Sequence, residues 1–149
     1  MNPDFLDFLR CLIEAGARFL VVGAHAMAVH GVPRATGDID IWVGSDPDNA
    51  GRVWGAILRF GVPASDLGVS RADFETPDKV IQIGLPPRRI DLLTSVSGLV
   101  FESAWTTRTT YSTDGIDVPF LSRADLVRNK RATGRPKDLV DLDELGGQA

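Results

Sequence analysis

The sequence predicts an α/β (α+β) fold, in which strands and helices alternate along one chain. A short apolar run, Phe19–Val22, ends at Gly23, which is typical of a covered strand that turns into a helix. Polar and apolar residues alternate from residue 38 to 43, as in a strand with one covered face. The pair Asp114-Gly115 separates two further strand-like segments and is a strong hairpin signal. These three observations predict a sheet accompanied by helices.

The other elements follow from capping residues and from the spacing of apolar side chains. Asn2 and Pro3 favour a helix start and Gly16 favours its end, while Asp46 and Gly61 bound a later helix in the same way. The Gly-, Pro- and Asp-rich segment 62–79 is predicted to be mainly loop, with a short helix near residues 71–74. The predicted helices are 3–15, 24–30, 47–60, a short one within 97–105, 122–134 and 136–145, and the predicted strands are 19–22, 38–43, 80–84, 89–93, 108–113 and 116–121.

Composition bounds the class of protein. The 149 residues are 44% hydrophobic and 24% charged, as in ordinary globular proteins. We therefore expect one domain over residues 1–149, with a core at 1–121 and a C-terminal helical segment at 122–149. The net charge of −4 argues against broad electrostatic binding to nucleic acid, although basic residues gather between 123 and 137. The single cysteine, Cys11, and the lack of a long apolar run or a basic leader predict a cytoplasmic location.

Asp38 and Asp40 are the first candidates for chemistry. Alternate side chains of a strand point to the same face, so the two carboxylates would lie side by side, with Cα atoms roughly 6–7 Å apart. Adjacent carboxylates repel each other unless a positive group lies between them, and Mg²⁺ and Mn²⁺ prefer such oxygen ligands. The alternative is a solvated acidic face on an edge strand.

A third acid completes the pattern. Asp91 lies in an apolar strand-like segment, where burial of a lone carboxylate is costly unless it is paired or metal-bound. Gly23-Ala24, then Asp38-Ile39-Asp40, then Asp91 resemble the motifs of the minimal nucleotidyltransferases of the DNA polymerase β superfamily. Together with the segment 130–141, the chain is similar to the nucleotidyltransferase toxins of abortive-infection toxin–antitoxin pairs. Ala24 departs from the Gly or Ser usual in that family, so a hydroxyl contact to phosphate is absent there.

This resemblance implies a nucleotidyltransferase fold, with a small mixed or antiparallel β-sheet flanked by helices and with helices at the C-terminal end. It implies that NMP is transferred from an NTP to an acceptor, with two Mg²⁺ or Mn²⁺ ions held by the catalytic residues Asp38, Asp40 and Asp91. Free N–H groups at a helix start attract anions, so we expect the triphosphate near the start of the second helix. The expected nucleotide-binding residues are Gly23, Ala24 and His25 at that start, Arg34 and Thr36 in the loop before the acidic strand, and Lys130, Lys137 and Asp138, whose positions match those of the toxins.

Several local alternatives stay open. Asp91 could pair with Arg88 or Arg89, and Arg34 with a nearby carboxylate. His25 could lie on the helix surface, and His30 fits a capping or packing role. The last helix, on which Lys137, Asp138 and Asp141 share a surface by their spacing, could be held by local ion pairs.

Three functions use the same residues. The first is nucleotidyl transfer to RNA or tRNA, a protein, or a small molecule, with a cognate antitoxin or toxin as a partner. The second is an inactive member of the fold that serves as an antitoxin or partner-binding module, which Ala24 favours. The third is a metal-dependent phosphohydrolase, which would release nucleotide without labelling an acceptor.

Overall fold

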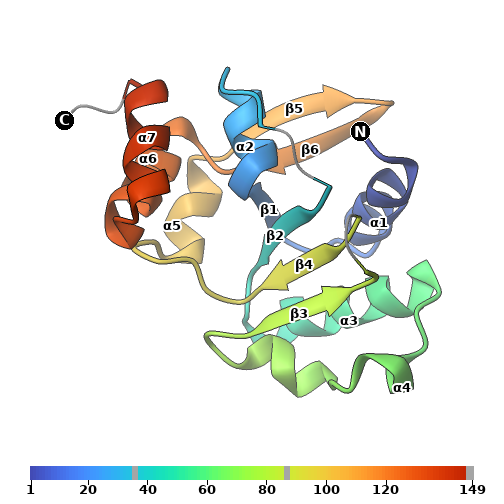
Figure 1. The fold of residues 1–149 in the computed structure, drawn as a ribbon. Helices are drawn as coiled ribbons and strands as arrows, with labels where there is room; N and C mark the ends of the chain where they lie inside the picture. Colours follow the sequence, from blue (N-terminus) through green and yellow to red (C-terminus); the bar gives the residue numbers. More distant parts are fainter. Residues whose placement is uncertain (35–36, 86–87, 147–149) are drawn as a thin grey trace.

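The computed structural model describes residues 1–34, 37–85 and 88–146. A six-stranded mixed sheet crosses the molecule in the order β3-β4-β2-β1-β6-β5 (Figure 1). Its strands are β1 (Phe19–Val22), β2 (Ile39–Val43), β3 (Val80–Ile83), β4 (Ile90–Leu93), β5 (Thr109–Thr113) and β6 (Ile116–Phe120).

The strand pairings place the acidic residues at the centre of the sheet. β2 runs antiparallel to β1, with Val22 opposite Asp40, and parallel to β4, with Asp40 opposite Asp91. β3 and β5 are the outer strands, each in an antiparallel hairpin with its neighbour. All four residues of β1 are buried, as expected of a strand covered on both faces.

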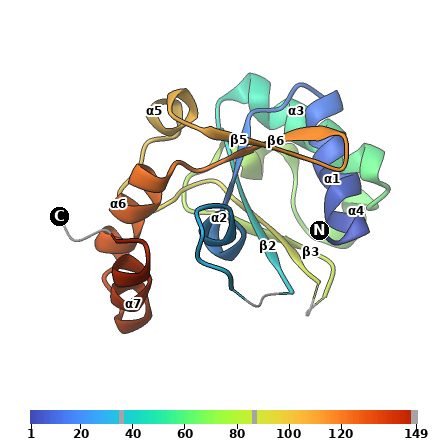
Figure 2. The same ribbon diagram turned by 90° about the horizontal axis from the view of Figure 1, so that it is seen from above.

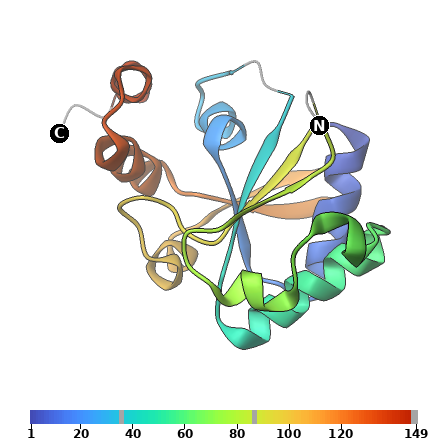
Figure 3. The same cartoon turned by 60° about the horizontal axis from the view of Figure 1, so that its bottom comes forward.

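Helices lie on both sides of the sheet. α3 covers one side and packs on α1, whereas α2 contacts β1 and β2 from the other side (Figure 3). α6 and α7 pack together near α2, at the end of the molecule away from α1 (Figure 2). The helices are α1 (Pro3–Glu14), α2 (Gly23–Val29), α3 (Pro47–Phe60), α4 (Ala64–Leu67), η1 (Arg71–Glu75, a 3-10 helix), α5 (Phe101–Thr106), α6 (Arg123–Thr133) and α7 (Pro136–Glu144).

The predicted capping residues bound these helices. The Asn2 side chain accepts a hydrogen bond from Asp4 N at 2.8 Å, and that of Asp46 accepts one from Asn49 N at 3.0 Å. Gly61 ends α3 in the left-handed region, with φ +99°. Such caps satisfy the free backbone groups at helix ends, so the predicted ends fall within a few residues of the observed ones.

The structure differs from the prediction mainly between residues 62 and 79. That segment was predicted to be mainly loop, yet it contains α4 as well as η1. η1 is fixed by a capping box, in which the Asp73 side chain accepts a hydrogen bond from Ser70 N at 2.8 Å. The buried ring of Phe74 anchors η1 against α3. No helix in the described part of the chain is both long and apolar enough to cross a bilayer.

Candidate active site

The acidic residues meet where β2 and β4 run side by side. Asp40 and Asp91 are opposite one another in the parallel pairing of these strands. Asp38 immediately precedes β2, and its Oδ1 accepts a hydrogen bond from the backbone N–H of Arg89 at 2.9 Å. The fold therefore brings together three acids that are up to 53 positions apart in the sequence.

The acidic cluster (Asp38, Asp40 and Asp91) places three carboxyl groups close together. Burial, the neighbouring carboxylates of Asp91 and Asp38, and a hydrogen bond with Asp91 raise the pKa of Asp40 to about 6. Asp91 is itself buried, at 8% exposure. Burial and the neighbouring carboxylates disfavour the charged form of Asp40. A cation bound beside Asp40 would favour that charged form.

Gly23 brings the start of α2 close to Asp40 of the acidic cluster. It has φ +65°, a conformation that side chains with a Cβ rarely adopt. A Cβ at this position would lie 2.4 Å from Asp40 Oδ2. Position 23 therefore requires glycine for two reasons: the left-handed turn and the close approach of the Asp40 carboxylate.

Asp40 and Gly23 line a cleft of about 750 Å³. Its walls come from α2, the segment after β4, α6 and α7, and the last two are far from α2 in sequence (Figure 1). The lining residues are Val22, Gly23, Ala24, Met27, Arg34, Asp40, Leu93, Ser95, Val96, Ser97, Asn129, Lys130, Thr133, Arg135, Lys137, Val140, Asp141 and Glu144.

A network of ion pairs organises the basic wall of the cleft. Arg34 pairs with Asp141 and, at 3.2 Å, with Glu144 of α7. Lys130 of α6 lies 3.0 Å from Asp141 and 3.5 Å from Asp138. The alternative foreseen for Arg34, a carboxylate partner, is thus present, although the partners come from the far end of the chain.

Asp138 lies beneath this network and is fully buried. Its Oδ2 accepts hydrogen bonds from Thr133 Oγ1 at 2.6 Å, Arg135 N at 3.1 Å and Arg135 Nε at 2.7 Å. These hydrogen bonds hold the pKa of Asp138 well below its usual range, and the bond from the Arg135 guanidinium has the largest effect. Asp138 therefore joins α6 to α7 and helps to fix the Lys130 ammonium, rather than lining the cleft.

The structure brings together most of the residues predicted from the sequence, but not all of them. Gly23, Ala24, Arg34, Asp40, Lys130 and Lys137 line the cleft. His25 is not among its lining residues in the described part of the chain; its ring packs edge-to-face on Phe5, with centroids 5.9 Å apart. Thr36 lies outside the described residues.

The second histidine, His30, for which a capping or packing role was predicted, is the C-terminal capping residue of α2. His30 Nε2 donates a hydrogen bond to the Leu121 carbonyl at 2.8 Å, which ties the end of α2 to the segment after β6.

Sequence reasoning missed several cleft residues. Thr133 lies three positions after Lys130 on α6, a helical spacing that would have placed it beside Lys130, and Asn129 lies four positions before Thr133 on the same face. Ser95, Ser97 and Glu144 carried no comparable signal, because their place in the cleft depends on how β4, α6 and α7 meet.

The donor set of the cluster suits a hard divalent cation, since all its ligating atoms are carboxylate oxygens. In the described residues, however, no group of three or more His, Cys, Asp or Glu side chains stands in an arrangement that could hold a metal ion. The guanidinium of Arg89 donates to both oxygens of Asp91, through Nε at 2.6 Å and a terminal nitrogen at 3.0 Å. The predicted alternative of an Asp91–Arg89 ion pair is therefore realised.

Comparisons with known proteins support the fold. No family model and no curated protein matches the sequence. A crystal structure of a proposed nucleotidyltransferase from Thermotoga maritima has a TM-score of 0.59 at 16% identity, over 100% of this chain and 96% of that one. An antigenic nucleotidyltransferase-like protein from Paracoccidioides brasiliensis has a TM-score of 0.53 at 18% identity, over 95% of this chain and 72% of that one. The chain thus has the nucleotidyltransferase fold, as the sequence predicted.

Proposed function

We propose that this protein is a metal-dependent nucleotidyltransferase that transfers NMP from an NTP to an acceptor. One observation carries the proposal: Asp40 belongs both to the acidic cluster and to the lining of a cleft that also presents Arg34, Lys130 and Lys137. An acidic cluster beside a basic wall matches a substrate that reacts at a phosphate bound to a divalent cation.

Asp38, Asp40 and Asp91 are the residues that would hold Mg²⁺ or Mn²⁺. Such ions, when bound, neutralise phosphate charge and align the attacking and leaving oxygens. The raised pKa of Asp40 supports this assignment, because mutual repulsion of the carboxylates is what a cation relieves. We assign Asp91 to accept the proton of the attacking hydroxyl, since each of its oxygens keeps a second lone pair beside the Arg89 hydrogen bond.

The other cleft residues bind the nucleotide. Gly23 allows a phosphate to approach the backbone closely, and Ala24 contributes only its backbone N–H in place of the hydroxyl of a serine. Arg34 and Lys130 supply positive charge that Asp141 holds in place before substrate arrives. Asp138 positions Lys130 from below.

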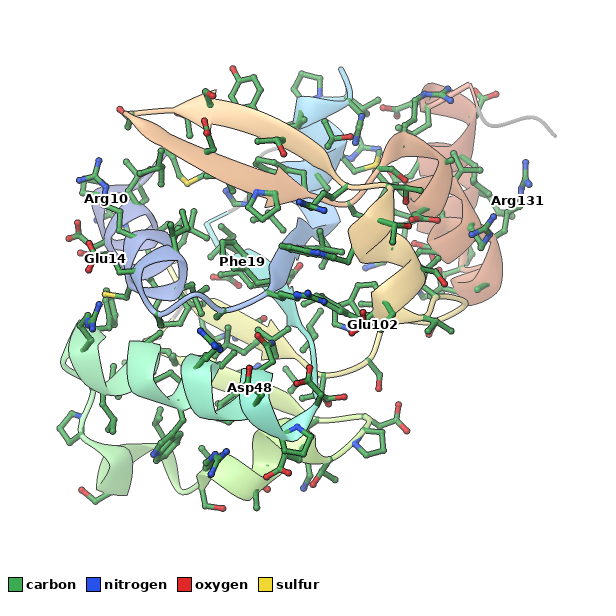
Figure 4. All side chains as sticks on the ribbon, turned by 180° about the vertical axis from the view of Figure 1, so that it is seen from behind. Arg10, Glu14, Phe19, Asp48, Glu102 and Arg131 are labelled. Atoms are coloured by element: carbon green, nitrogen blue, oxygen red, sulfur yellow. The ribbon has the colours of Figure 1, made fainter. Side chains whose placement is uncertain are left out.

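Transfer of label tests this function. The protein is incubated with each α-³²P-labelled NTP, Mg²⁺ or Mn²⁺, and total RNA, lysate protein or small-molecule acceptors. We expect label in one acceptor class, and we expect Asp40→Asn to abolish it. The matched control is Asp48→Asn, which changes an exposed carboxylate on α3 (Figure 4). Equal labelling by Asp40→Asn and the wild type would refute the assignment, and release of free nucleotide without acceptor labelling would indicate a phosphohydrolase.

A second candidate function is a partner-binding module without transferase activity, such as an antitoxin. The ion pair between Asp91 and Arg89 favours this second function, as does Ala24 in the glycine motif. Calorimetric titration with each NTP and Mg²⁺ separates the two functions, because the module predicts no heat of binding with any NTP. A toxin–antitoxin role predicts in addition that a cognate protein co-purifies with the tagged chain.

A further inference from the structure

The strand β5 is an edge of the sheet that nothing in its own sequence protects. It stands last in the strand order and, among the described residues, pairs only with β6 (Figure 1). Edge strands of natural proteins usually carry a charge, a proline or a bulge that prevents pairing with another chain. β5 reads Thr-Thr-Tyr-Ser-Thr, and its register with β6 is continuous. The other edge strand, β3, differs, because α4 packs beside it and Lys79 precedes it.

The turn between β5 and β6 determines which backbone groups of β5 face outward. Asp114-Gly115, with φ +49° and +80°, forms a two-residue hairpin turn after Thr113. Such a turn closes on a hydrogen-bonded pair, so every second residue counted back from Thr113 bonds to β6. The backbone N–H and C=O groups of the residues between them, Thr110 and Ser112, are therefore directed away from β6, toward a further strand.

The centre of this edge is an aromatic ring. Tyr111 is 52% exposed, although its ring packs edge-to-face on Phe120 with centroids 6.3 Å apart. Aromatic side chains that lie opposite one another on two paired strands stabilise the pairing. A strand that paired with β5 and placed an aromatic residue opposite Tyr111 would therefore cover the exposed part of this ring.

The two ends of β5 carry opposite charges. Arg108 precedes the strand, and its guanidinium is held 3.9 Å above the Trp105 ring centroid and donates to the Trp105 carbonyl at 2.8 Å. Asp114 follows the strand; its carboxylate accepts a hydrogen bond from Thr113 Oγ1 at 3.0 Å, and its carbonyl accepts one from Arg10 at 2.8 Å. An antiparallel copy of the same strand would place each positive end beside a negative end, so β5 is complementary in charge to itself.

We propose that β5 pairs antiparallel with β5 of a second copy of this chain, which forms a two-fold symmetric dimer with one continuous sheet. The register that uses both outward-facing residues places Thr110 opposite Ser112 of the second copy and Tyr111 opposite its own counterpart. The same register places Arg108 opposite Asp114 of the second copy, at both ends of the pairing. The dimer is independent of the proposed function, because none of the residues that line the cleft belongs to β5.

Sedimentation velocity over a range of protein concentrations tests the dimer. Thr110→Pro removes an outward-facing N–H and leaves the hydrogen bonds to β6, whereas the matched control Thr110→Val keeps that N–H. We expect the wild type and Thr110→Val to dimerise with rising concentration. Thr110→Pro loses one hydrogen bond in each copy, so its dissociation constant should rise about tenfold or more.

Two results of this measurement would overturn the proposal. One is a dimer of unchanged affinity in Thr110→Pro, which would place the interface elsewhere. The other is a wild type that stays monomeric at every concentration, in which case β5 would be left for a strand of a different protein.

Cysteine cross-linking tests the register and needs no loss of a contact. In a Cys11→Ser background, Tyr111→Cys would place two thiols opposite one another in a non-hydrogen-bonded pair, with Cα atoms about 4.5 Å apart, which a disulfide can span. The control Thr113→Cys lies on the same face, but its two copies would be four residues out of register, roughly 13 Å apart. Air oxidation should therefore cross-link Tyr111→Cys much faster, and equal rates would refute this pairing.

Asp114→Asn tests the charge complementarity. Asparagine tolerates the positive φ of the turn, so the variant removes the charge and keeps the hairpin. We expect weaker dimerisation that depends less on salt than in the wild type, and no change in the control Asp48→Asn, an exposed carboxylate on α3. Unchanged affinity and salt dependence in Asp114→Asn would overturn the pairing of Asp114 with Arg108.

Discussion

Gly23 lies so close to Asp40 that a Cβ at the glycine would be 2.4 Å from the carboxylate oxygen Oδ2. This contact joins the turn before α2 to the acidic strand β2, two segments that the antiparallel pairing of β1 with β2 brings side by side. The shape of the candidate site therefore depends on the absence of one methyl group.

Gly23→Ala should damage activity more than stability. The left-handed conformation, φ +65°, costs a residue with a Cβ about 1–2 kcal/mol. The methyl group must also displace the Asp40 carboxylate, and a misplacement of about 1 Å in an active site can cost on the order of 100-fold in rate. We expect such a loss in nucleotide transfer, measured alongside urea unfolding.

Gly115→Ala is the matched control for this change. Gly115 has φ +80° in the β5–β6 turn, and nothing lies within 4 Å of its added Cβ. It should lose similar stability and keep its transfer rate. Equal rates in the two variants would show that contact with Asp40 has no functional role.

Asp40 should make the metal-free protein less stable as pH rises. Its pKa in the folded state is raised to about 6, first by burial and then by the charges of Asp91 and Asp38. In the unfolded chain an aspartate titrates near pH 4. The unfolded chain therefore gives up this proton first, and the free energy of unfolding falls between about pH 4 and 6.

Asp40→Asn removes this contribution. Above pH 6, without divalent cations, the variant should be more stable than the wild type by about 1–2 kcal/mol. Urea unfolding across pH 4–8 measures the difference, and Mg²⁺ should stabilise only the wild type. A variant less stable than the wild type at pH 7 would mean that the ionised Asp40 side chain does not destabilise the folded protein.

Asp138 should anchor the two C-terminal helices. Because it is fully buried and holds Thr133 and Arg135, Asp138→Asn leaves those donors without a charged partner. We expect a loss of about 3 kcal/mol in urea unfolding. Thr133→Val removes only the hydroxyl bond and should cost about 1 kcal/mol. Equal losses in the two variants would contradict a central role for the carboxylate.

The same carboxylate should give the protein an acid-sensitive step. Arg135 holds the pKa of Asp138 below its usual value, so its stabilising effect is complete above about pH 4. As pH falls below 4 the unfolded chain takes up the proton first, and stability is lost. The pH dependence of unfolding between pH 2 and 5 should therefore be shallower in Asp138→Asn, and identical slopes would count against the assignment.

His25 offers a direct test of one sequence prediction. Its Nδ1 is buried without a hydrogen-bond partner, burial lowers the pKa of the ring, and the ring packs on Phe5. His25→Phe keeps the aromatic contact and removes the unpaired nitrogen, so we expect stability to be equal or higher by about 1 kcal/mol. NTP affinity, measured by calorimetry, should not change. A weaker affinity would place the ring at the nucleotide after all.

Local signals predicted most of the secondary structure. Asn2, Asp46 and Gly61 bound their helices because capping satisfies backbone groups within a few residues. The Asp114-Gly115 hairpin was predicted for the same reason, since both residues adopt the positive φ that this turn requires. α4 was missed because its four residues carry no apolar period and its cap lacks a side-chain hydrogen bond.

The candidate site was predictable only in part. Asp38, Asp40 and Gly23 are close in sequence, and the alternation of strand side chains indicates how they lie. Arg34 was expected near the site, but its partners Asp141 and Glu144 could not be inferred, because they lie more than 100 residues away. Likewise, strand spacing suggests that Arg89 can reach Asp91, whereas its contact with Asp38 depends on the pairing of β4 with β2.

By itself, the sequence determined most of the helices and strands, where the three acids stand, and which glycine turn precedes them, because those features depend on neighbours within a few residues. The tertiary structure alone decided that Asp40 faces both Asp91 and the cleft, that His25 packs on Phe5, and that Arg89 also reaches Asp38. Those relationships depend on strand order and helix packing, which join residues that no local pattern connects.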